Sequence, residues 1–251
     1  MNTNIIDGVE PDVSAPDRRA WWLTSSDRGG LRGGLIACVE IDAGYADDVV
    51  GYADVEQAIL VLSGEMTLEG DAAHTVGARD IVFVPRASGY RLTVPQHVRF
   101  LQIFAGVSSP DELEQAQRRT DGSTISVTAI DDVAGMDAND DAMGIYNVVS
   151  KPLVMAGIVE SQNLLVGHTQ FRANGGLHKL HKIEVDEFVY LLSGTATALS
   201  EDGEREVSEG TLLHIPAGTW SGLRVSGETP AETIFGYVEA ATFDKLGYTR
   251  R

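Results

Sequence analysis

Hydrophobic and polar residues alternate through most of the chain, in short runs that are typical of β-strands. Gly, Asp and Pro residues separate the runs. Those in the first half are Gly34–Ile41, Gln57–Leu62, Glu65–Leu68, Ile81–Val84, Tyr90–Val94 and Arg99–Phe104. The alternation resumes near Ile145 and continues to Glu239. Short strands at this close spacing, with almost no helical periodicity, predict an all-β sandwich or barrel.

The alternating pattern occurs twice. Glu56–Gly70 (EQAILVLSGEMTLEG) and Asp186–Gly203 (DEFVYLLSGTATALSEDG) each close one strand on Ser-Gly and resume as a second strand. Downstream, each copy has another strand that runs into a proline, within Asp80–Tyr90 and Thr211–Gly222. A duplication of this kind predicts two similar β-domains rather than one mixed domain.

The remaining segments divide the chain further. Residues 1–19 are polar and are expected to form an extended arm, followed by a first barrel over residues 20–106. Residues 107–144 are expected to be a linker, and residues 145–251 the second barrel. Ser109 and Pro110 start a short helix in the linker, because a hydroxyl cap and a proline at the first position favour a helix N-terminus. We expect this helix to run to about Arg118.

Composition excludes some classes of function. The chain of 251 residues carries 19 basic and 37 acidic residues, a net charge of −18, which disfavours binding to nucleic acid or to an anionic membrane. Its start has neither a basic segment nor an apolar core, and no apolar stretch approaches the ~20 residues of a membrane span. We therefore expect a cytoplasmic protein. Cys38 is the single cysteine, so no internal disulfide can form.

The histidines are distributed unevenly between the two copies. The second copy holds four of the six, namely His168, His178, His181 and His214, whereas the first copy holds only His74 and His97, away from its Ser-Gly hairpin. Metal binding or acid–base chemistry is therefore expected in the C-terminal copy.

The spacing in that copy resembles the two sequence motifs of the cupin superfamily. Gly175, His181, Glu187 and Gly194 stand at the spacing of the first motif, G-x5-H-x-H-x(3,4)-E-x6-G. The glycines and proline of the second motif, G-x5-P-x-G-x2-H-x3-N, are Gly210, Pro216 and Gly218. With both copies counted, the chain looks like a bicupin. The resemblance implies two tandem double-stranded β-helix (jelly-roll) barrels, joined here by the short helix.

The chain departs from the family at two of the four positions that hold a divalent metal. Ile183 replaces the second histidine of the first motif, and Ser221 replaces the histidine of the second motif. His181 and Glu187 remain as the candidate catalytic pair. Alone they would hold a metal weakly, because a site normally has at least three protein ligands.

Two other histidines are candidates to complete a metal site. His178 would need a bend near Gly175 to face inward with His181, and His214 lies in the strand that enters Pro216. A set of His178, His181, Glu187 and His214 would suit Fe, Mn, Ni or Zn. The alternative is a metal-free barrel, in which the two additional histidines only pack or face solvent.

Five further residues are candidates for the pocket, namely His168, Gln170, Arg172, Trp220 and Ser221. An inward Arg172 would favour a substrate that bears a carboxylate, although exposure at the surface is an equal alternative. Trp220 follows Pro216, in a region that lies at the barrel mouth in cupins, and it either covers a substrate or seals the barrel.

The N-terminal copy lacks the metal-binding residues. Gln57 stands where the family has glutamate, and Tyr90 replaces the histidine of the second motif. This barrel is expected to be structural, filled by side chains or used in subunit contacts. In the alternative, Gln57, Tyr90 and Gln102 line a polar pocket.

Three functions remain open. The resemblance implies an enzyme that is metal-assisted (an oxygenase, isomerase, decarboxylase or hydrolase) and acts on a small polar substrate in the C-terminal barrel. A metal-free enzyme would use His181 and Glu187 as an acid–base pair. A metal-free barrel could also bind a small ligand or serve assembly without catalysis. A homodimer is expected, because the arm with Trp21 and Trp22 is suited to cover a sheet edge.

Overall fold

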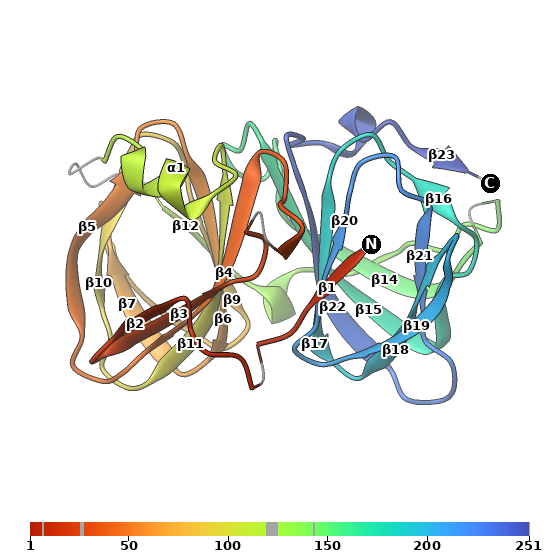
Figure 1. The fold of residues 1–251 in the computed structure, drawn as a ribbon, viewed down its shortest axis with the longest axis horizontal. Coiled ribbons are helices and arrows are strands. Elements are labelled where there is room, and N and C mark those ends of the chain that lie inside the picture. Colours follow the sequence, from red (N-terminus) through yellow and green to blue (C-terminus); the bar gives the residue numbers. More distant parts are fainter. Residues whose placement is uncertain (7, 26–27, 119–124, 143, 251) are drawn as a thin grey trace.

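Two β-barrels lie side by side in the computed structural model, which describes residues 1–6, 8–25, 28–118, 125–142 and 144–250 (Figure 1). The chain builds the N-terminal barrel first and then the C-terminal barrel, and strands dominate both. The predicted all-β class and the predicted pair of jelly-roll barrels are thus confirmed. None of the helices in the described part of the chain is long and apolar enough to cross a membrane.

The N-terminal barrel consists of a seven-stranded and a four-stranded antiparallel sheet. The larger sheet contains β2 (Val13–Ala15), β3 (Arg18–Trp22), β4 (Gly34–Ile41), β6 (Glu56–Ser63), β9 (Asp80–Val84), β11 (Val98–Ala105) and β12 (Ser126–Ala129). The smaller contains β5 (Ala46–Tyr52), β7 (Glu65–Glu69), β8 (Ala73–Gly77) and β10 (Ser88–Thr93). β12 comes from the segment predicted as a linker and pairs with β9.

The C-terminal barrel is one twelve-stranded antiparallel sheet that folds back on itself. Ten of its strands are β14 (Ile145–Val154), β15 (Leu164–Leu177), β16 (His181–Lys182), β17 (Glu187–Ser193), β18 (Thr195–Ser200), β19 (Gly203–Ser208), β20 (Leu212–Ile215), β21 (Ser221–Arg224), β22 (Ala231–Val238) and β23 (Thr249–Arg250). The other two are β1 (Asn2–Asn4) from the arm and β13 (Met136–Asp137) from the linker.

The repeated Ser-Gly pair makes the same sharp turn in each barrel, from β6 to β7 and from β17 to β18. It is not the hairpin expected from the sequence, because the two strands on either side of the turn pair with other strands and not with each other. Gly64 and Gly194 have positive φ angles of 80° and 81°. A side chain at either position would also collide with the backbone of a neighbouring strand. Only glycine meets both conditions, which explains why the dipeptide is present in both copies.

The arm and the linker helix match their predictions in part. β1 pairs with β20, so the arm covers an edge of the C-terminal barrel within its own chain. Helix α1 (Pro110–Gln115) begins as predicted, with the Ser109 hydroxyl accepting a hydrogen bond from the Glu112 backbone. It ends earlier than predicted, because Ala116 takes an extended conformation.

The two barrels share one hydrophobic core. Buried side chains of β6, β9 and β11 pack in one cluster with those of β15, β17 and β22, among them Leu60, Phe83, Phe188 and Ile234. Burial of this joint face stabilises the pair by roughly 1.5–3 kcal/mol for each large apolar side chain. Because one face of each of these strands packs against the other barrel, only the opposite face lines a barrel interior.

Candidate functional site

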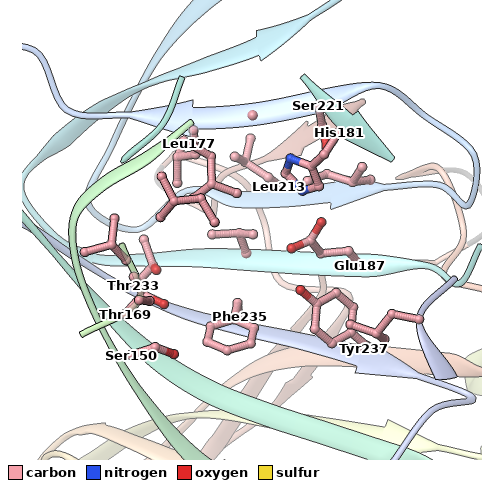
Figure 2. A pocket seen from close by; sticks show the side chains of 18 of the residues that line it. Ser150, Thr169, Leu177, His181, Glu187, Leu213, Ser221, Thr233, Phe235 and Tyr237 are labelled. Atoms are coloured by element: carbon pink, nitrogen blue, oxygen red, sulfur yellow. The ribbon is translucent and has the colours of Figure 1, made fainter. Parts of the chain in front are cut away.

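The interior of the C-terminal barrel contains a cavity of about 330 Å³ (Figure 2). Most of its wall is apolar and comes from alternate residues of the surrounding strands, namely Val148, Phe171, Val189, Leu213, Leu223 and Phe235. Polar side chains lie at two separated places on this wall, with Phe235 between them. The cavity therefore has an apolar middle and two polar ends.

Glu187 is the central residue of the first polar end. It is the first residue of β17, its carboxyl group points into the cavity, and only 7% of the residue is exposed. Burial raises the pKa of Glu187 to about 7, against a smaller lowering by a hydrogen bond with Tyr237. Tyr237 stands directly opposite on β22. A carboxyl group with this pKa is available both as an acid and as a base near neutral pH.

His181 lies beside Glu187 at the same end of the cavity. It is held on β16, where it pairs with Ser221 of β21 on one side and with Arg250 of β23 on the other. Burial lowers the pKa of His181 to about 4, so the imidazole is neutral at physiological pH. Its Nδ1 atom is buried and has no hydrogen-bond partner in the described part of the chain.

The second polar end is a row of hydroxyl groups. Ser150 on β14 stands opposite Thr169 on β15, and Thr169 stands opposite Thr233 on β22. All three line the cavity and lie close together on the far side from Glu187 (Figure 2). Hydroxyl groups both donate and accept, so this row is suited to an uncharged polar group.

The C-terminal tail closes the cavity next to His181. A 3₁₀ turn over Phe243–Lys245 is followed by the buried Leu246, and Phe243, Leu246 and Tyr248 all line the cavity. The Tyr248 ring stacks on the imidazole of His181, with ring centroids 4.9 Å apart and an interplanar angle of 2°.

The structure does not assemble the proposed four-ligand metal set. Leu213 and Ile215 point into the cavity, so His214, between them, points to the opposite face. There its Nε2 lies 3.2 Å from a carboxylate oxygen of Asp186. His178 lies outside the cavity and packs against the Tyr146 ring, with centroids 5.7 Å apart.

The residues present therefore do not fit a divalent metal ion. Among the described residues of the cavity wall, His181 and Glu187 are the only ones with an imidazole or a carboxylate group. Elsewhere in the described ranges, no three His, Cys, Asp or Glu side chains are grouped closely enough to hold an ion. A stable site normally has at least three protein ligands, so the candidate set of His178, His181, Glu187 and His214 has no structural support.

Three other pocket candidates lie on the outer face of the barrel. Thr169 and Phe171 point inward, which places His168, Gln170 and Arg172 on the opposite side of β15. His168 is buried there, with its Nε2 3.2 Å from Glu232, and Arg172 is exposed. The prediction that these three residues line the pocket is wrong. Side chains alternate between the two faces of a strand, and here the neighbouring residues face the cavity instead.

The two candidates near Pro216 differ in outcome. Ser221 lines the cavity as expected, beside His181. Trp220 does not line it, and the ammonium group of Lys182 lies 5.2 Å from the centre of its indole ring instead.

Sequence reasoning missed two aromatic residues of the site. Tyr237 continues the inward alternation of Thr233 and Phe235 along β22, so the period-two pattern of this strand could have revealed it. Tyr248 reaches the cavity from a tail with no strand pattern, and nothing in its local sequence indicates that position.

The chain was compared with known proteins at two levels. Residues 169–237 match a family model described as the cupin domain, which places the match on the strands around the cavity. No curated protein sequence matches the chain.

Solved structures are similar over nearly the whole chain. A glyoxylate-induced protein from Pseudomonas aeruginosa superimposes with a TM-score of 0.71 at 17% identity, covering 92% of this chain and 85% of that one. A mutant of oxalate decarboxylase from Bacillus subtilis gives a TM-score of 0.69 at 10% identity, with coverage of 100% and 79%. Vicilin from hazelnut, Corylus avellana, gives 0.65 at 12% identity, with coverage of 99% and 87%.

These identities show a common fold and nothing finer, because an enzyme and proteins of other descriptions share it. The double barrel, the motif glycines, and the family match around His181 and Glu187 agree with one another. The C-terminal barrel therefore contains a region similar to the cupin domain, and the whole chain has the fold of two cupin-type β-barrels in tandem.

Proposed function

We propose that the C-terminal barrel is a metal-independent enzyme that moves a proton within a small, uncharged substrate. The observation that carries the proposal is the buried Glu187, whose carboxyl pKa of about 7 lies close to physiological pH. Such a pKa is costly to maintain in an apolar wall, and it is the property that a general acid–base requires. The neutral His181 beside it supplies a hydrogen-bonding group without adding charge.

The wall of the cavity defines the substrate class. The described residues of this wall include neither lysine nor arginine, so none of them balances the charge of an anionic substrate. Oxalate, the substrate named for the Bacillus subtilis relative, is a dianion and does not suit this cavity. We infer a molecule with an apolar middle, a carbonyl group near Glu187 and His181, and an uncharged polar group that bonds to the hydroxyl row (residues 150, 169 and 233).

These groups support an isomerisation that needs no additional reactant. The Glu187 carboxylate accepts a proton from the carbon next to the carbonyl group, and the electron pair of that C–H bond moves toward the carbonyl oxygen. An N–H of His181 donates to this oxygen as negative charge develops on it. In a substrate with a C=C bond between the β- and γ-carbons, Glu187 then returns the proton to the γ-carbon while the double bond moves next to the carbonyl group, so that atoms and charge balance. Tyr237 is a positioning residue, because its hydrogen bond orients the carboxyl group.

Hydrogen–deuterium exchange at carbon tests the proposal directly. Small ketones and enones of matching size would be incubated with the protein in D₂O, and loss of the α-proton signal would be followed by ¹H NMR. Replacing Glu187 with glutamine keeps the shape but removes the base, and we expect the exchange rate to fall by about 10²–10⁴-fold. Glu206→Gln, a change of the same charge on the exposed strand β19, is the matched control and should leave the rate unchanged.

A second function, ligand binding without catalysis, is favoured by the largely apolar wall of the cavity. It predicts that Glu187→Gln binds the same compounds as well as the wild type and that neither protein accelerates exchange. Adding a chelator to the buffer tests whether the activity depends on a metal ion, which neither of these two functions requires. We expect no loss of exchange activity in its presence, and an activity that needs added metal would contradict the proposal.

A further inference from the structure

The N-terminal barrel also has a cavity, which the acid–base proposal does not use. It measures about 90 Å³ and lies among β3, β4, β5, β10 and β11. Its walls include the side chains of Arg18, Arg118, Tyr90 and Gln102. Unlike the cavity of the C-terminal barrel, it is lined by guanidinium groups as well as apolar side chains.

One donor on the cavity wall, on Arg18, and one behind the wall, on Gln57, have no acceptor. The Nε of Arg18 and the Nε2 of Gln57 are buried and have no hydrogen-bond partner among the residues that the structure describes. The amide of Gln102 donates to Gln57 Oε1 at 3.0 Å and to the Tyr90 hydroxyl at 3.4 Å. The Tyr90 hydroxyl accepts this bond, which leaves its own proton to be donated. A buried donor without an acceptor costs roughly 1–3 kcal/mol, so the unpaired donors lower the stability of the empty barrel.

The charges around the cavity are unequal. Two arginines, Arg18 and Arg118, face one carboxylate, Asp47. Asp47 already accepts a hydrogen bond of 3.0 Å from the Tyr45 hydroxyl. Arg118 lies over the ring of Tyr52, 5.8 Å from its centroid, and forms no ion pair within the described ranges. Among the described residues that line the cavity, the positive charges thus exceed the negative charges by one.

We propose that this cavity binds a small monocarboxylate, with its two oxygens accepting from Arg18, Tyr90 and the glutamine pair. A carboxylate supplies the acceptors that the buried donors lack and the single negative charge that the arginines leave unbalanced. The volume of about 90 Å³ admits an ion of the size of acetate and excludes larger ligands. A divalent metal does not fit, because the cavity presents donors rather than acceptors.

The proposal explains why Gln57 stands where the family has glutamate. A carboxylate at this position would be buried next to the bound anion, with no cation on its own strand, whereas an amide adds a donor. The position that carries the acid–base residue in the C-terminal barrel therefore has an anion-binding role in the N-terminal barrel.

Isothermal titration with sodium acetate, at constant ionic strength set with sodium chloride, tests this site on the full-length protein. We expect saturable binding of one acetate per chain and no binding of acetamide, its neutral isostere. Arg18→Gln should weaken acetate binding at least tenfold, because it removes a charge-assisted hydrogen bond. Arg91→Gln removes the same charge from the exposed face of β10 and should have no effect.

Two further variants keep the test decisive. Tyr90→Phe removes a single hydroxyl group without changing the ring, so it serves if Arg18→Gln does not fold, and it should also weaken acetate binding. Glu187→Gln should bind acetate as the wild type does, which separates this site from that of the C-terminal barrel. A titration that shows no saturation in the wild type would overturn the proposal, as would equal affinities in the wild type, Arg18→Gln and Tyr90→Phe.

Discussion

The two barrels of this chain share a fold but enclose opposite environments. At the start of β17 the C-terminal barrel has Glu187, opposite Tyr237 and Ile215. At the corresponding place in β6 the N-terminal barrel has Gln57, opposite Phe104 and Val84. One cavity is largely apolar with a titratable carboxyl group, and the other carries guanidinium groups and buried amides.

This difference shows how little of a barrel interior the fold itself determines. The strand order, the Ser-Gly turns and the joint core tolerate either lining, because they depend on backbone pairing and on the outward faces of the strands. The inward positions are therefore free to diverge after a duplication. Glu187 and Gln57 occupy corresponding positions in the two barrels. In our proposals, the first transfers a proton and the second contributes to anion binding.

We expect the largest change in stability when the N-terminal barrel is given the glutamate that the C-terminal barrel has at the corresponding position. Gln57→Glu places a carboxyl group at a residue that is 0% exposed and has an amide and aromatic rings as neighbours. Desolvation of a carboxylate at this depth is costly, and the arginines of the cavity wall offset only part of that cost, so we expect the free energy of unfolding at pH 8 to fall by about 3 kcal/mol. Urea denaturation would measure the loss, which should shrink at pH 5 as the new carboxyl group is protonated. An unchanged unfolding free energy at both pH values would show that the N-terminal cavity is open to water.

The second prediction concerns pH. The pKa of Glu187 is about 7 in the folded chain, above its ordinary value of 4.5, so the folded state holds the extra proton. Its contribution to stability is present at low pH and is lost as pH rises from 4.5 to 7. The pKa of His181 is about 4 in the folded chain, below its ordinary 6.5, so the unfolded state holds the extra proton. Its contribution is therefore lost as pH falls from 6.5 to 4.

The two effects oppose each other, each by about 3 kcal/mol over its window, and nearly cancel between pH 4.5 and 6.5. Removing one group should reveal the other. Relative to the wild type, Glu187→Gln should gain stability with rising pH across this interval, and His181→Gln should lose it. Denaturant titrations at half-unit pH steps would measure both slopes, and equal slopes in the two variants would contradict the assignment.

The smallest effect is expected at the contact between the barrels. Arg79 of the N-terminal barrel pairs with Asp131 and with Glu232 of the C-terminal barrel, at 2.8 Å in each case. The arginine side chain is 38% exposed, so solvent weakens both pairs. We expect Arg79→Gln to lower the unfolding free energy by about 1 kcal/mol, and less in 1 M salt. A loss that is independent of salt would indicate packing rather than charge.

The sequence was sufficient for the fold and for the centre of the site. The duplicated Ser-Gly segment identified two barrels, and motif spacing placed His181 and Glu187 on the same cavity wall. Strand phase was harder to predict. The first part of β15, from Leu164 to Thr169, is buried on both faces, since one face lines the cavity and the other packs against the N-terminal barrel. Alternation then no longer distinguishes the two faces, which is why Thr169 rather than His168 points inward.

The C-terminal tail has a consequence for kinetics. Tyr248 and the two residues of β23 dock beside His181, over the cavity, through few contacts. Detaching them locally costs less than unfolding the barrel, so we expect brief openings of the tail to widen the way into the cavity. A ligand that contacts Tyr248 would then hold the tail closed and slow its own release. We therefore expect the residence time of such a ligand to depend on Tyr248 and β23.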